Sequence, residues 1–349
     1  MSSAPQRLDG LDIARYLAFV GMVIVNFKIA MGADGDLGFA ASFSSLFEGR
    51  AAATFVVLAG VGFGLAAQRN TYITTLKITL KRALFLLFIG LLNMTIFEAD
   101  ILHYYAIYFA FAAFNSGCKT QPLIWAIFSL NIAFLVLIIV LDYDAGWNWT
   151  TLTYSEFWTP TGFIRNLFFN GWHPVIPWLS FFYFGMALSR QTLTQSETQN
   201  RLIGWGALAL IAAQAASYVL MPLATLIDPE LTPLLGTTPV PPGPLYVIAG
   251  LGAASLVTGL CLRGAHVMRR AGILGIVAPA GRQTLTLYVA HILVGMGALE
   301  AFNMLEGQTA VMALIAAIAF SALATAYAWG WSKLFKRGPL EALMRKMAG

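Results

Sequence analysis

Apolar residues occur in ten long runs along the chain, separated by shorter polar segments. The runs cover residues 11–31, 50–68, 82–97, 101–116, 121–141, 174–189, 202–221, 244–262, 283–300 and 308–331. A helix needs about 20 apolar residues to cross a bilayer, and most of the runs approach that length. The pattern therefore predicts an all-α fold: a polytopic integral membrane bundle of about ten transmembrane helices, forming one membrane domain over 1–349.

Two connections between the runs carry structural information. The third and fourth runs are joined only by Phe97-Glu98-Ala99-Asp100, which predicts a tight helical hairpin. The longest connection, 143–173, is rich in aromatic residues, and its stretch from Ser155 to Asn170 has the pattern of an amphipathic helix at the outer membrane interface. Aromatic side chains there either anchor the protein at the interface or form a lid over an outer pocket.

The composition excludes several classes of protein. The chain is 58% hydrophobic and only 11% charged, whereas soluble domains are about 25% charged. A soluble enzyme, a disordered chain and a DNA-binding domain are therefore excluded. The net charge of +5 comes from scattered basic residues, so no nucleic-acid partner is expected. Cys118 and Cys261 fall at predicted cytosolic helix ends, where a disulfide is not expected.

The basic residues set the predicted orientation. With the N-terminus in the cytosol, 17 of the 21 lysines and arginines fall in inner segments, and only Arg50 and Arg165 lie in outer loops. The positive-inside rule then places both termini in the cytosol. We expect an integral protein of the bacterial cytoplasmic (inner) membrane. Most acidic residues lie outside, which either favours an amine-bearing ligand there and a phosphate-bearing ligand inside, or merely complements the charge bias of the membrane.

Polar residues at membrane depth are costly and are the first candidates for function. On the opening run, Asp12 and Arg15 are three residues apart and share a helix face, and Asn26 returns to that face about three turns later. This polar stripe must face the interior of the bundle. It either serves function or holds neighbouring helices together through hydrogen bonds.

A second group lies in the predicted hairpin. Asp100 and His103 are three residues apart at a helix start, followed by Tyr104. The carboxylate is placed to orient the imidazole, whose other nitrogen would then be a competent general base near neutral pH. In the alternative interpretation Asp100 only caps the helix.

Two further groups contain the remaining candidate histidines. Trp172-His173-Pro174 enters the sixth run from outside and continues to Trp178. It is either a ligand-binding entrance or a rigid elbow. In the ninth run, Tyr288 and His291 are three residues apart at mid-membrane depth, with Arg282 at the cytosolic end. A buried interhelical hydrogen bond would also explain that pair.

Several of these segments, taken in order, resemble a known family. They are Arg7-Leu-Asp-Gly-Leu-Asp12-Ile-Ala-Arg15 with Asn26, Leu46-Phe-Glu48-Gly-Arg50, Lys81-Arg82, Asp100-Ile-Leu-His103, His173-Pro-Val-Ile-Pro-Trp178 with Arg190, and Gly281-Arg282 to Tyr288. The set resembles the transmembrane acyltransferase superfamily, which contains heparan-alpha-glucosaminide N-acetyltransferase. It is closest in pattern to the YeiB-like (DUF418) branch.

The resemblance implies an enzyme that moves an acyl group, most simply acetyl, from cytosolic acyl-CoA to an amine or hydroxyl acceptor at the outer side, such as a sugar or small metabolite. Asn26 matches an asparagine implicated in the mammalian relative. The histidine implicated beside it has no counterpart here, because residues 31–50 contain none. His103 or His173 would have to take its place.

The residue types suit this chemistry, which needs a base and donors for the developing oxyanion. We expect His103, oriented by Asp100, to be the base and Asn26 to be the oxyanion donor, with His291 and Tyr288 as a relay. Acyl-CoA would be the co-substrate, without a metal. Its phosphates would be bound by Arg15, Arg82, Arg190 and Arg282. The acceptor would be bound by Glu48, Arg50, Tyr104, Trp172, His173 and Trp178.

Two other classes of function fit the same residues. A small-solute transporter or binding protein would use the polar stripe without acyl chemistry. A membrane redox protein would use two of His103, His173 and His291 as axial haem ligands. The expected partners are the lipid bilayer and a small-molecule or glycan acceptor, and a homodimer is left open.

Overall fold

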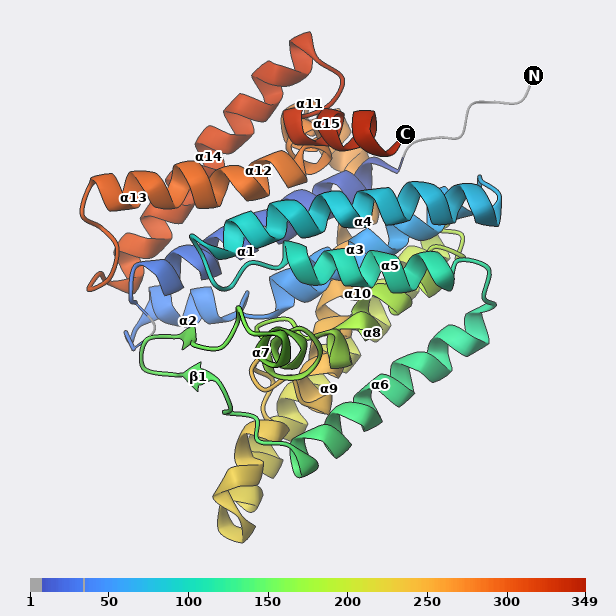
Figure 1. Ribbon diagram of the computed structural model, residues 1–349. Helices are drawn as coiled ribbons and strands as arrows, with labels where there is room; N and C mark the ends of the chain where they lie inside the picture. The colour runs from blue at the N-terminus through green and yellow to red at the C-terminus, as the bar shows by residue number, and fades with distance from the viewer. Residues whose placement is uncertain (1–7, 34) are drawn as a thin grey trace. The chain divides into compact units, whose positions relative to one another are not determined.

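The computed structural model describes residues 8–33 and 35–349, so Arg7 of the opening motif lies outside the described residues. Within them, the chain forms helices almost throughout (Figure 1). All ten apolar runs fall on helices, which confirms the all-α polytopic fold. Seven helical segments have the length and hydropathy to cross a membrane: Asp9–Ala30, Phe39–Ala67, Thr120–Val140, Ser196–Ile227, Pro244–Arg270, Thr284–Ala301 and Ala310–Leu334.

The other three runs correspond to α4 (Tyr72–Met94), α5 (Leu102–Phe114) and α8 (Val175–Leu188). The last two are apolar but shorter than a typical span. The first half of α4 carries Lys77, Lys81 and Arg82, which lowers its hydropathy. The short fourth run and the charged third run together form the predicted hairpin.

The described residues separate into two compact units. The first, called here the α1 unit, comprises the chain up to Leu58, Gln191–Ala207 and Gly252–Leu343. The second, called the α5 unit, comprises Ala59–Arg190, Leu208–Leu251 and Met344–Gly349. Among the described residues, four helices contribute to both units: α3 (Arg50–Ala67), α9 (Ser196–Ile227), α10 (Pro244–Arg270) and α15 (Pro339–Ala348).

In the α1 unit, α1 (Asp9–Ala30) packs against α11 (Leu274–Arg282) and α14 (Ala310–Leu334), as Figure 1 shows. The helix after α11 is built from three consecutive pieces: α12 (Thr284–Ala290), the π-helical turn η3 (His291–Met296) and α13 (Gly297–Ala301). The short α2 (Phe39–Ser45) contacts α1 and α14. Thr309 caps α14, since its hydroxyl accepts from the Met312 amide.

The start of α12 is capped from a distant part of the chain. The Glu341 carboxylate, on α15 (Pro339–Ala348), accepts from the amides of Leu285 and Thr286 at 2.8 and 3.1 Å. The Thr286 hydroxyl donates to the same carboxylate at 2.5 Å. These contacts satisfy amides that have no partner within the first turn of a helix. The acidic cap thus stabilises the helix that leads to His291.

In the α5 unit, α4 and α5 form an antiparallel hairpin and lie side by side (Figure 1). Gly90 makes the close crossing possible, because a side chain there would collide with the backbone of Leu102 and His103. Helix α8 packs against both α5 and α6 (Thr120–Val140). The 3-10 turn η2 (Pro229–Leu235) follows α9.

The outer aromatic connection differs from its prediction. It contains a two-stranded antiparallel ribbon, β1 (Trp147–Asn148) with β2 (Thr153–Tyr154), in which Trp147 pairs with Tyr154. Helical structure begins only at α7 (Pro160–Arg165) and continues as the π-helical turn η1 (Asn166–Asn170). The predicted helix from Ser155 is therefore wrong over its first five residues, because Thr159 caps a helix that starts at Pro160.

Candidate functional site

One polar cluster lies in the α1 unit, at the start of α1. The Arg15 guanidinium donates to the Asp12 carboxylate at 2.7 Å, which confirms the predicted pairing. Arg282 approaches the other oxygen of Asp12, with its Nε 3.9 Å away. Gly281 permits this approach, because a side chain there would collide with the Asp12 backbone. Two of the four arginines expected to bind acyl-CoA thus converge on one buried carboxylate.

Further along the same helices, Asn26 and His291 meet. The Asn26 Nδ2 lies 2.9 Å from the His291 Nε2, and the His291 ring is fully buried. The ring packs edge-on against Phe19 and Tyr288. In the sequence, Asn26 belongs to the polar stripe of the first run and His291 to the ninth run, and the structure brings the two residues together.

The contacts of His291 define which of its nitrogens is a base. The His291 Nδ1 is hydrogen-bonded to the Tyr288 carbonyl oxygen, which can only accept, so Nδ1 carries the proton. In the neutral ring Nε2 then has the free electron pair, and the Asn26 amide donates to it. This arrangement orients the imidazole from one side and presents a basic nitrogen on the other.

His291 is also the first residue of the π-helical turn η3. Such turns are rare and are found disproportionately at functional sites. Sequence reasoning did not identify the Asn26–His291 pair. The available signal was that Asn26 is a polar residue within a span and therefore needs a partner from another helix.

At the C-terminal end of α1, Lys28 forms an ion pair with Glu48, with 2.7 Å between nitrogen and oxygen. Lys28 is buried, so the pair compensates a charge that would otherwise be costly. Arg50 donates to the carbonyl oxygen of Ser45 at 3.1 Å, at the end of α2. The expected acceptor ligands Glu48 and Arg50 thus have structural contacts within the α1 unit.

A second polar cluster lies in the α5 unit around His103, which is fully buried. The distance from the His103 Nδ1 to the Asp100 carboxylate is 3.6 Å, too long for a hydrogen bond. Asp100 instead accepts from the Leu102 amide at 2.7 Å and from the Asn93 side chain at 3.1 Å. Ile101 is the N-terminal cap of α5, so Asp100 is not the cap that the alternative interpretation expected; it binds the backbone just before the helix and remains close enough to act on His103 electrostatically.

Aromatic rings connect His103 to the entrance of α8. Tyr104 lies against His103, with ring centroids 3.9 Å apart, and His173 lies against Trp178 at 4.6 Å. Tyr104 and His173 are themselves in edge contact at 5.8 Å. The structure thus brings together four of the predicted site residues, and Trp172 is adjacent to His173 in the chain. Tyr104 also donates to Asn166 of η1 at 2.6 Å.

This α5-unit cluster contains an unusual number of unsatisfied polar atoms. Among the described residues, buried side-chain nitrogens without a hydrogen-bond partner include both of His103, Nδ1 of His173, and Nε1 of Trp172 and of Trp178. Buried polar groups are normally paired, so a concentration of unpaired ones indicates a place where a ligand or water binds. Burial lowers the pKa of His173 to about 3, and the neighbouring His103 adds to the lowering.

The other two arginines expected to bind acyl-CoA lie in the α5 unit. Arg190 donates to the Thr120 hydroxyl at 2.9 Å and to the Cys118 carbonyl oxygen, which ties the start of α6 to the end of α8. Arg82 is half-buried on α4. Across residues 8–33 and 35–349, no group of three or more histidine, cysteine or acidic side chains is placed to hold a metal ion.

Two family models match the chain. The model for heparan-alpha-glucosaminide N-acetyltransferase, catalytic, matches residues 7–217, and the model for a protein of unknown function (DUF418) matches residues 187–349. The first match covers more than half of the chain, which therefore belongs to this family, in a YeiB-like branch that carries the DUF418 region. No curated protein and no solved structure matches the chain. The family match supports an acetyltransferase-like function in a membrane.

Proposed function

We propose that this protein is a membrane acyltransferase that moves an acyl group, most simply acetyl, from acyl-CoA to an amine or hydroxyl of a sugar or small metabolite at the outer side. The single observation that carries the proposal is the Asn26–His291 contact of 2.9 Å. The resemblance implies an asparagine paired with a histidine, and residues 31–50, which follow Asn26, contain no histidine. His291 takes the place of that missing partner. The family match supports the same class of reaction.

In the proposed reaction, His291 is the general base, a role that the sequence alone favoured for His103. Its Nε2 takes the proton from the acceptor amine or hydroxyl as that atom attacks the thioester carbonyl carbon. The new C–N or C–O bond forms and the C–S bond breaks. The leaving thiolate then takes from Nε2 the proton that came from the acceptor. The bond from Nδ1 to the Tyr288 carbonyl stabilises the ring while it is charged.

Asn26 has a second role in the same step. Its amide donates to Nε2 in the resting arrangement, and it turns to the carbonyl oxygen as negative charge develops there. Because His291 is fully buried, the substrates reach Nε2 only by displacing this amide and part of the surrounding packing. The closed arrangement therefore keeps water from the base when no substrate is bound.

The donor would approach along α1. Arg15 and Arg282 offer guanidinium groups suited to phosphate oxygens, and Asp12 holds both in place. From Arg15 to Asn26 is eleven residues, or roughly 17 Å along the helix axis. A donor with its charged end at the arginines would extend its acyl arm along α1 to the Asn26–His291 pair.

The α5-unit cluster would be a binding place of its own for a sugar or small metabolite. Unpaired imidazole and indole nitrogens suit the hydroxyl and amine groups of such a molecule, and the aromatic rings supply apolar faces. The same unpaired groups would bind a solute in transit, so a small-solute transporter, for which the sequence offered the polar stripe of α1, is the second candidate function.

The test is acyl transfer by the full-length protein in lipid nanodiscs, with radiolabelled acetyl-CoA and a panel of amino sugars and small alcohols. We expect His291→Ala and Asn26→Ala to lower the transfer rate at least about 100-fold, the usual scale for a positioned acid–base group. Acetyl-CoA binding should persist in both variants. Asn200→Ala, which changes an exposed residue of α9, is the matched control and should transfer at the wild-type rate.

Full activity in His291→Ala would remove His291 from the chemistry and return the base to His103 or His173. If the wild-type protein transfers no acyl group to any acceptor but takes up solutes in vesicles under a proton gradient, the enzyme proposal is wrong and the transporter stands.

A further inference from the structure

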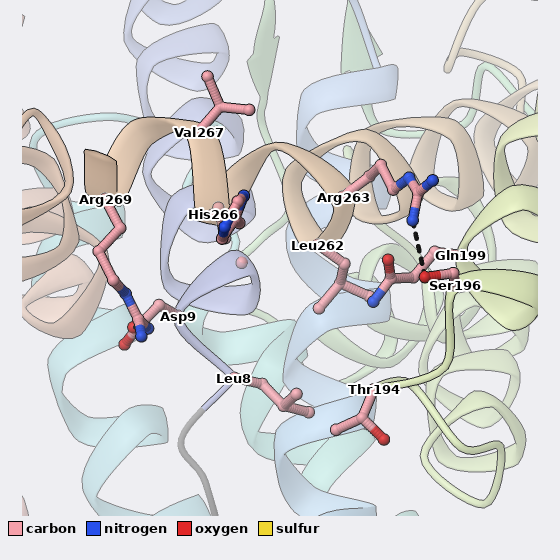
Figure 2. Close-up of a pocket in the computed structure, with 12 residues that line it drawn as sticks. Leu8, Asp9, Thr194, Ser196, Gln199, Leu262, Arg263, His266, Val267 and Arg269 are labelled. Atoms are coloured by element: carbon pink, nitrogen blue, oxygen red, sulfur yellow. Dashed lines mark hydrogen bonds and ion pairs between the residues drawn. The ribbon is translucent and has the colours of Figure 1, made fainter. Parts of the chain in front are cut away.

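A pocket of about 650 Å³ lies in the α1 unit, apart from the residues discussed so far (Figure 2). It is formed by the first residues of α1, the start of α9 and the final turns of α10. Its volume is in the range of pockets that bind nucleotide-sized molecules. All three elements that form it fall at predicted cytosolic ends of spans.

Three basic side chains line the pocket from one helix. Arg263, His266 and Arg269 are spaced three residues apart on α10, so they lie along one face, as Figure 2 shows. All three are exposed. None of them was among the residues expected to bind acyl-CoA. They face the pocket as a row of donors that carries two permanent positive charges.

Arg263 and Arg269 each have a hydrogen-bond partner in the protein and still keep N–H donors for a ligand. Arg263 donates to the Ser196 hydroxyl at 2.7 Å, and Arg269 pairs with the Asp9 carboxylate. A guanidinium has five N–H donors, so each arginine has several left for a ligand. Ser196 is also the first residue of α9, a helix of 32 residues, whose first amides lie at the same pocket.

We infer that this pocket binds a phosphate-bearing group, a phosphomonoester or pyrophosphate, through Arg263, His266 and Arg269. Arginine is the side chain best matched to phosphate because its planar fork makes two parallel hydrogen bonds. Asp9 is the one acidic side chain among the described lining residues, and it offsets one of the two arginine charges. The pocket therefore keeps a net positive charge for an anion.

The phosphate pocket rests on the proposed function in one respect, the identity of the donor. If the donor is acyl-CoA, the pocket would bind the 3′-phosphate of its nucleotide, and Arg15 and Arg282 would bind the pyrophosphate that leads to the acyl arm. The pocket includes Asp9, and Asp12 and Arg15 follow within two turns of the same helix. Asn26 is 17 residues beyond Asp9, about 25 Å along the axis, so a long flexible arm would connect the two places. An anionic lipid headgroup offers the same phosphate chemistry.

The experiment measures binding of adenosine 3′,5′-bisphosphate, which carries no acyl group, to the full-length protein in phosphatidylcholine nanodiscs by calorimetry. We expect Arg263→Gln and Arg269→Gln each to weaken binding about tenfold, the scale of one lost charge-assisted hydrogen bond. Arg270→Gln is the matched control, since Arg270 carries the same charge on the same helix but does not line the pocket. It should bind like the wild-type protein.

Asp9→Asn separates binding from folding. It removes the carboxylate that competes for Arg269, so we expect binding to tighten several-fold, whereas a variant that only perturbs the fold would bind more weakly. A second arm replaces phosphatidylcholine with phosphatidylglycerol. Loss of nucleotide binding in those discs that persists at higher salt would identify the lipid headgroup as the competing phosphate source, because salt screens the long-range repulsion between the nucleotide and the anionic surface.

Each outcome bears on one proposal at a time. Nucleotide binding that falls in Arg263→Gln and Arg269→Gln supports the pocket even if the wild-type protein transfers no acyl group. Acyl transfer with an unchanged KM for acetyl-CoA in both variants overturns the pocket and leaves the proposed function intact. Absence of nucleotide binding to the wild-type protein in phosphatidylcholine discs also overturns the pocket.

Discussion

The two histidine clusters differ in how completely their hydrogen bonds are satisfied. In the α1 unit, both nitrogens of His291 have partners, in Asn26 and in the Tyr288 carbonyl. In the α5 unit, both nitrogens of His103 are buried without one. A satisfied imidazole has a fixed orientation and a defined basic atom, which chemistry requires. An unsatisfied group gains most when a ligand arrives. The difference favours reaction at His291 and binding at His103.

The clusters also share one feature. Each contains a π-helical turn: η3 begins at His291, and η1 contains the Asn166 that accepts from Tyr104. The family matches divide differently, since Asn26 lies only in the acetyltransferase match and His291 only in the DUF418 match. The Asn26–His291 contact therefore joins a residue of one matched region to a residue of the other within the α1 unit.

The largest expected difference between the clusters is kinetic. His291→Gln should lower kcat by about 10²–10⁴, because it removes the proton acceptor. His103→Gln and Trp178→Phe should instead leave kcat unchanged and weaken the binding of a sugar or small metabolite to the α5-unit cluster about tenfold each, because each removes a group that would pair with it. Steady-state kinetics measures kcat, and calorimetry measures the binding constant. A collapse of kcat in His103→Gln with a normal rate in His291→Gln would exchange the roles of the two clusters.

The close helix contact beside each cluster can be disrupted by its own substitution. Gly281→Val would force α11 away from Asp12, and Gly90→Val would force α4 away from His103. We expect each to destabilise the protein by about 3 kcal/mol or more, because the collisions are with backbone that cannot move aside. Thermal unfolding in detergent measures the effect. Gly204→Ala is the control: nothing lies within 4 Å of the added carbon, and a helical alanine should stabilise by about 0.5–1 kcal/mol.

The smallest expected effect is the pH dependence that His173 contributes in the α5 unit. The pKa of His173 is about 3 in the folded protein and about 6.5 when unfolded. The unfolded chain therefore binds a proton that the folded protein does not, and stability falls as the pH drops below about 6.5. The loss approaches about 1.4 kcal/mol per pH unit below 6.5, which amounts to about 2 kcal/mol at pH 5.

The measurement is the melting temperature at pH 7.5 and at pH 5, compared between the wild-type protein and His173→Gln. The variant should lose less stability on acidification, because the other titrating groups are common to both proteins. Equal losses in the two proteins would show that His173 is not held neutral. Above pH 6.5 the two curves should run in parallel.

Much of the fold followed from the sequence, because hydrophobic run length directly determines which segments enter a bilayer. The ten runs and the tight α4–α5 hairpin were predicted in this way. The β1–β2 ribbon was not, since two strands of two residues leave no periodic pattern to detect. The π-helical turns were missed for a related reason: one extra residue in a turn leaves the apolar pattern of the run unchanged.

Within the candidate sites, local pairings were predictable and distant ones were not. Asp12 and Arg15 lie one helical turn apart, so their contact follows from helix geometry. Asn26 and His291 are separated by 265 residues, and their contact depends on how α1 packs against the later helices. Lys28 lies in the first apolar run, and its partner Glu48 was identified only by the structure. Spacing fixes contacts within an element, and packing fixes those between elements.

The Glu341 cap on α12 has a consequence for biosynthesis. Glu341 is translated 55 residues after Thr286, and the whole of α14 lies between them. While the nascent chain is being inserted, the helix that carries His291 enters the membrane with its first amides still uncapped. The ribosome must complete α14 and the turn after it before the carboxylate reaches them. The geometry of the proposed catalytic histidine is therefore completed late, only after α14 and the turn that follows it have been made.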